Sequence, residues 1–179
     1  MTSFKYLVLL AFTFLLAAPS AAQAQPASFV DLGIIGTPGT FTFDTVGSTN
    51  DTAGGDLDTE IALFDAAGIL LDTDDDGLGF PFSTVTQPLA SGQFFIAISE
   101  FNSIWEDGFV NTGTQFEAGE VGTAVLNING ATAGSLAIGE ADGLEEQAFF
   151  RVEVSAVPEP GSVSLLALAG LAAFVRRRR

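Results

Sequence analysis

Three aspartates at alternate positions are the residues in this sequence with the clearest capacity for chemistry. Asp72, Asp74 and Asp76 are followed by Gly77, and Asp75 adds a further carboxylate within the run. In a tight loop this spacing places alternate carboxylates on one side, and glycine permits the sharp turn. Calcium in proteins is bound by oxygen ligands, many of them carboxylates. The run therefore predicts a calcium site at Asp72, Asp74 and Asp76, with a solvated acidic turn as the alternative.

The acidic run reproduces only the beginning of a helix–loop–helix calcium motif. Ser83 stands where that motif has its bidentate glutamate, and no helical pattern flanks the run. A looser site would borrow a carboxylate from the preceding stretch, where Asp56, Asp58 and Glu60 lie. Several carboxylates that fold close together repel one another unless a cation sits among them, which favours such a site.

The amino-acid inventory excludes most catalytic devices. The chain has no Cys and no His, and its only lysine is Lys5. Serine triads, Cys–His dyads, zinc or copper sites built from His or Cys, and lysine chemistry in the body are therefore excluded. A carboxylate pair of the glycosidase kind is the common device that remains, and Glu100, Glu106 and Asp107 are its nearest candidates. We expect no catalytic activity from so small a domain.

Short alternating apolar segments separated by turn residues must position these groups. No segment of the body, residues 25–156, shows a sustained helical period, so the pattern predicts one all-β sandwich with a jelly-roll order. Most of the chain's seventeen phenylalanines lie in the body and supply large side chains for a core that has no disulfide. Strands are expected at residues 28–35, 40–45, 59–65, 69–71, 82–87, 93–99, 123–129, 136–138 and 147–155.

The stretch from Glu100 to Glu120 is long for a connection in a compact domain. It carries Phe101, Trp105, Phe109 and Phe116 among glycines, asparagines and acids. We expect these aromatic side chains to fold back and cap the core. The alternative is a functional loop in which Trp105 and the phenylalanines form an exposed platform, as in a carbohydrate-binding module.

Negative charge dominates the body. Of the chain's 22 acidic residues, 21 fall within residues 25–156. Only one of its six basic residues does, so the body has a formal charge of −20. Such a surface repels nucleic acids and anionic membranes, and favours solubility and the uptake of cations. We therefore expect no nucleic-acid partner.

Residues 1–24 have the composition of an export signal. Lys5 precedes an apolar run over residues 7–18, which is too short for a transmembrane helix. Ala22 and Ala24 place small residues at the two positions that a signal peptidase reads. The expected cleavage follows Ala24.

Three features follow one another at the other end of the chain: a Val-Pro-Glu-Pro stretch, an uncharged apolar run over residues 162–175, and four arginines. The prolines prevent a helix from extending backwards. As a helix the run would be about 21 Å long, against about 30 Å of bilayer hydrocarbon, and the arginines would stay on the cytoplasmic side. The flanking residues are Val157, Pro158, Glu159, Pro160, Arg176, Arg177, Arg178 and Arg179.

In this order, residues 157–179 resemble the PEP-CTERM sorting signal of exported bacterial proteins; a plain tail anchor would need no Pro-Glu-Pro. The resemblance implies processing by an exosortase-type enzyme, a transient anchor in the inner membrane, and a final place at the cell surface or outside the cell. It also implies a link to exopolysaccharide or biofilm, with extracellular polysaccharide as a partner. We expect a non-catalytic structural or adhesion-type protein, with a carbohydrate-binding module or a small glycosidase as alternatives.

Two segments of the body resemble the pre-peptidase C-terminal-like β-sandwich domains of exported bacterial proteins. One runs from Thr59 to Gly68 and continues into the acidic run, and the other runs from Leu89 to Ile98. This chain has Phe where those domains more often have Tyr. The resemblance implies a β-sandwich and indicates no particular activity.

Overall fold

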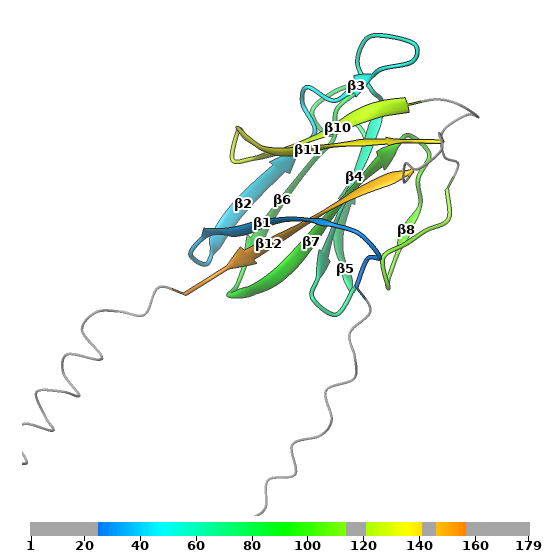
Figure 1. The fold of residues 1–179 in the computed structure, drawn as a ribbon. Coiled ribbons are helices and arrows are strands. Elements are labelled where there is room, and N and C mark those ends of the chain that lie inside the picture. Colours follow the sequence, from blue (N-terminus) through cyan, green and yellow to red (C-terminus); the bar gives the residue numbers. More distant parts are fainter. Residues whose placement is uncertain (1–24, 114–120, 141–145, 157–179) are drawn as a thin grey trace, which may run out of the picture.

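The computed structural model describes residues 25–113, 121–140 and 146–156, in which every regular element is a β-strand (Figure 1). The predicted all-β fold is confirmed. The strands are β1 (Val30–Gly36), β2 (Gly39–Asp44), β3 (Thr49–Asn50), β4 (Thr59–Asp65), β5 (Leu70–Asp74), β6 (Thr84–Leu89), β7 (Gly92–Glu100), β8 (Trp105–Glu106), β9 (Val110–Asn111), β10 (Val121–Ile128), β11 (Ala131–Gly139) and β12 (Gln147–Val154).

Two sheets form the sandwich. The first has the order β1-β12-β7-β4-β5, in which only β1 and β12 are parallel, and the second has the order β11-β10-β2-β6 with β3 beside β10. The order departs from a strict jelly roll, because β4–β5 and β10–β11 pair as hairpins within one sheet. Short glycine-containing connections favour such local pairing.

The main core lies between the two sheets. Side chains alternate along each strand, so every second residue of β4, β7 and β12 faces the second sheet. Burial of each large apolar side chain stabilises the fold by about 1.5–3 kcal/mol. Those that are almost completely buried in this core are Phe43, Leu57, Ile61, Leu63, Val85, Ile96, Ile98, Leu126, Ile138 and Phe150.

The hairpin of β4 and β5 sets the position of the acidic run. Its turn is held by the Asp65 carboxylate, whose Oδ1 accepts the backbone N–H groups of Ala67 at 2.8 Å and Ile69 at 2.9 Å. Gly68 has a φ of +80°, which favours glycine. Strand β5 then continues to Asp74, beyond the expected end at Leu71. The first half of the acidic run is therefore strand, where we expected a tight loop.

The outer face of the first sheet is also covered. The two-stranded β8–β9 ribbon lies over it and inserts Trp105 and Phe109, which are only 5% and 8% exposed. Trp105 meets the rings of Phe64 and Phe149 edge to face, with centroids 5.9 and 6.0 Å apart. Phe149 lies on the outer face of the first sheet and is buried by the ribbon. The expectation that aromatic residues fold back is confirmed for Trp105 and Phe109, whereas Phe101 is exposed.

Within the described ranges, no helix is long and apolar enough to cross a membrane. The predicted export signal at residues 1–24, Phe116 and the sorting signal at residues 157–179 lie outside these ranges.

Candidate metal centre

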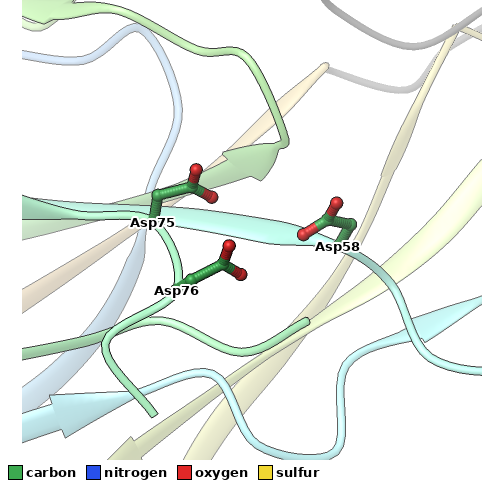
Figure 2. Close-up of side chains that lie close together, drawn as sticks. All are labelled: Asp58, Asp75 and Asp76. Atoms are coloured by element: carbon green, nitrogen blue, oxygen red, sulfur yellow. The ribbon is translucent and has the colours of Figure 1, made fainter. Parts of the chain in front are cut away.

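Asp58, Asp75 and Asp76 meet at one end of the sandwich, and we call them the acidic cluster (Figure 2). Each offers one carboxylate oxygen, and these oxygens all lie within 4.8 Å of one another. Asp58 immediately precedes β4, and the other two immediately follow β5. Because β4 and β5 are antiparallel, with Ile61 opposite Asp74, the start of one strand and the end of the other share this end.

Buried hydroxyl groups hold the backbone beside the acidic cluster. Ser83 is fully buried, and its Oγ lies against the backbone carbonyl oxygens of Thr59 and Asp75. The hydroxyl has one hydrogen, which it can donate to one of these two oxygens at a time. The backbone N–H of Ser83 donates to Thr45 Oγ1 at 2.9 Å, and that oxygen lies 2.6 Å from Thr59 Oγ1. These bonds fix the start of β4 and the end of β5 relative to each other.

The carboxylate of Asp74 shapes the turn that follows β5. Its Oδ2 accepts the backbone N–H groups of Gly77 and Thr84, both at 2.8 Å. A Cβ at position 77 would lie 2.4 Å from that oxygen, so the turn requires glycine for this close approach. Asp72 also has protein partners, because its Oδ2 accepts from Gln87 Nε2 at 2.8 Å.

The structure thus brings together a different set of carboxylates from the predicted trio. Only Asp76 of Asp72, Asp74 and Asp76 belongs to the acidic cluster, and Asp75 and Asp58 take the other two places. The reason is the extended backbone, since alternate residues of a strand are roughly 7 Å apart and project in parallel. The turn between β4 and β5 is the sequence signal that could have located the acidic cluster. Pairing residues outward from that turn places Asp75 and Asp76 beside the start of β4.

Burial and mutual repulsion raise the pKa values of these acids. Burial, followed by the charges of Asp76 and Asp75, raises the pKa of Asp58 to about 6. Burial, followed by the charge of Asp75, raises the pKa of Glu60 on β4 to about 7. Burial, with the charges of Asp76 and Asp74, also raises the pKa of Asp75. Each of these shifts shows that a negative charge is unfavourable at this end of the sandwich.

Two carboxylate oxygens of the acidic cluster are buried without a hydrogen-bond donor among the described residues. They are Oδ1 of Asp58 and Oδ1 of Asp75. The body's single basic residue, Arg151, does not compensate them, because it pairs with Asp31 and lies 4.9 Å over the ring of Phe29. A bound cation would satisfy both oxygens and relieve the repulsion. Oxygen-only ligands suit calcium better than zinc, which prefers nitrogen and sulfur.

The carboxylates considered for glycosidase chemistry have other surroundings. Asp107 Oδ1 accepts the backbone N–H of Leu70 at 2.8 Å, which fastens the β8–β9 ribbon to β5. Glu106 is exposed on β8, and Glu100 ends β7. Trp105, which a carbohydrate platform would need at the surface, is buried beneath the ribbon.

Comparison with known proteins identifies the end of the chain. Residues 156–179 match the family described as the PEP-CTERM protein-sorting motif, which confirms the predicted signal at residues 157–179. The motif implies export of the protein and its sorting by an exosortase. No curated protein and no solved structure matches the chain, so the resemblance of the body to pre-peptidase C-terminal-like domains finds no support.

Proposed function

We propose that this chain is a non-catalytic structural protein of the cell surface or extracellular matrix, delivered through its sorting motif. The motif at residues 156–179 carries the proposal. The precursor is held in the inner membrane by the apolar run until an exosortase-type enzyme processes it, and the body is then released or retained at the surface. The same motif supports our proposal of a link to exopolysaccharide or biofilm.

The described body supports a structural role. Both faces of its first sheet are packed, one against the second sheet and the other beneath the β8–β9 ribbon. The buried Trp105 argues against a carbohydrate-binding platform, and the bonded Asp107 argues against a glycosidase pair. A packed, highly acidic domain suits a hydrated matrix, where its charge keeps it soluble.

We further propose that calcium binds the acidic cluster once the protein has been exported. The two donor-less carboxylate oxygens are the observation that favours an ion over a solvated turn. Glu60 lies outside the acidic cluster, although burial and then the charge of Asp75 raise its pKa. Calcium accepts irregular oxygen shells, whereas magnesium demands a near-ideal octahedron. A dissociation constant of about 10⁻⁴ to 10⁻³ M, the range of extracellular modules, would suffice outside the cell.

The intact mass of the exported protein tests the delivery route. We expect a mature chain that begins near Gln25 and ends between Pro158 and Pro160, because cleavage-compatible residues bracket both apolar ends. Expression in an exosortase-deficient strain is the matched control, and there the precursor should stay in the membrane fraction. An exported mass that still includes Arg176 to Arg179 would contradict exosortase processing.

A further inference from the structure

The hairpin of β10 and β11 is electrically neutral on a strongly acidic molecule. From Val121 to Gly139 the sequence contains no charged residue, although the body as a whole carries −20. In the described part of the chain, β11 is the outermost strand of the second sheet and pairs only with β10. Its other backbone edge therefore has no strand partner among the described residues (Figure 1).

As far as the structure describes the chain, the outer strands of the two large sheets other than β11 are β1, β5 and β6, and each carries features that discourage pairing with a further strand. On β5 these are Asp72 and Asp74, and on β6 it is Pro88. Strand β1 has Asp31 and two irregularities in its register with β12. Charges, prolines and bulges are the usual means by which proteins blunt exposed edges. Strand β11 has no charge and no proline, and its one irregularity lies near its beginning.

The side chains of β11 also allow close approach. Residues 134–139 pair in regular register with β10, so this part of the strand is straight enough to accept a neighbour. Ala133, Ser135 and Ala137 are exposed, while Ile138 is buried in the core. Small neutral side chains leave the unpaired backbone groups accessible, and such groups are a template for strand addition.

We propose that β11 is a self-association edge, through which two copies of this chain pair antiparallel about a two-fold axis. An antiparallel pair of identical strands is self-complementary, so it closes as a dimer. Charge favours a second copy at this place, because two bodies of −20 repel each other least where their facing surfaces are neutral. The inference goes beyond the proposed function and depends neither on calcium nor on processing.

Cysteine cross-linking tests the geometry, because the chain has no Cys and one introduced thiol is unique. In the exported protein, Ala133→Cys, Ser135→Cys and Ala137→Cys are made one at a time and oxidised mildly. The position nearest the two-fold axis should give mainly a disulfide-linked dimer, since directly opposed residues of antiparallel strands approach within disulfide range. The matched control is Thr86→Cys, exposed on β6 at the opposite edge of the same sheet, which should give no disulfide-linked dimer because the two thiols lie far apart in the proposed pair.

Sedimentation equilibrium tests the association itself. The unmodified exported protein should give the mass of a dimer, and Ser135→Lys and Ser135→Asp should each give a monomer, because like charges would face each other across the axis. An equimolar mixture of the two variants should recover the dimer. The proposal would be overturned if the unmodified protein were a monomer or formed open-ended chains. It would also be overturned if both variants kept the mass of the unmodified protein, or if Thr86→Cys gave as much cross-linked dimer as the β11 positions.

Discussion

Neighbouring aspartates at the end of β5 have different structural roles, because their carboxylates point toward different groups. Asp74 turns its carboxylate toward the backbone N–H groups of Gly77 and Thr84 and so builds the turn. Asp75 and Asp76 face Asp58 across the hairpin, where no described donor satisfies Asp75 Oδ1. Carboxylates that hold the fold and carboxylates of the acidic cluster therefore follow one another within a few residues.

Calcium should raise the thermal unfolding midpoint of the exported protein above that in sodium chloride of equal ionic strength. Binding to the folded state alone adds roughly 2.7 kcal/mol at a calcium concentration 100-fold above the dissociation constant. Asp75→Asn should remove most of this effect, because it takes one of the three carboxylates from the acidic cluster.

Two asparagine variants make that experiment specific. Asp56→Asn removes an exposed charge two residues from Asp58 without touching the acidic cluster, and should preserve the calcium effect. Asp72→Asn should also preserve it, whereas a site built on Asp72, Asp74 and Asp76 would lose it. Equal midpoints in the two salts would mean that the end of the sandwich is a solvated acidic turn.

Without calcium, the protein should become less stable as the pH rises from about 5 to about 8, because acids with raised pKa values lose their protons. The pKa of Asp58 is about 6 and that of Glu60 about 7 in the folded protein, above the ordinary 3.8 and 4.5. In this window the folded state binds more protons than the unfolded state, so stability falls with rising pH. Arg151 lowers the pKa of Asp31, which acts in the opposite direction but only below 3.8.

Thermal unfolding in a metal chelator at a series of pH values measures this dependence. The double variant Asp58→Asn/Glu60→Gln should remove most of it, because only Asp75 of the three acids with raised pKa values remains. A midpoint of the parent protein that rises between pH 5 and 8, or a slope that the double variant retains, would show that other groups control the pH response.

At the scale of elements, the β8–β9 ribbon gives the first sheet its second packed face. Asp107 ties the ribbon to β5, and the backbone N–H of Gly108 donates to the carbonyl of Gly68 at 2.7 Å. Gly68 also lies against the ring of Phe109, where an added Cβ would come within 3.0 Å of a ring carbon. The ribbon and the β4–β5 turn are therefore fitted to each other.

Trp105→Ala should lower the free energy of unfolding by about 3–5 kcal/mol, because it empties a buried aromatic site beneath the ribbon. Ile104→Ala is the matched control: Ile104 is 58% exposed and should change stability by less than about 0.5 kcal/mol. Urea unfolding followed by circular dichroism measures both. Similar small losses in the two variants would show that the ribbon opens without unfolding the sandwich.

For the whole molecule, the negative charge of the body is consistent with the export that the sorting motif implies. The motif at residues 156–179 implies export, and basic residues are confined to Lys5, Arg151 and the final four positions. The body that reaches the outside therefore carries almost only negative charge. An acidic body stays soluble and gathers cations from its surroundings, which suits both the proposed calcium site and a neutral edge as the place of self-association.

The class of fold, the sorting motif and most strands could be predicted from the sequence, because alternation, turn residues and charge distribution are local features. Strand 59–65 was predicted to the residue. The calcium hypothesis named Asp72, Asp74 and Asp76, whereas the structure groups Asp58, Asp75 and Asp76, since Asp58 meets Asp75 only through the register of two paired strands. Burial of Trp105 was likewise decided by tertiary packing, because an aromatic residue in a long connection fits a platform or a cap equally well until the sheet beneath it is known.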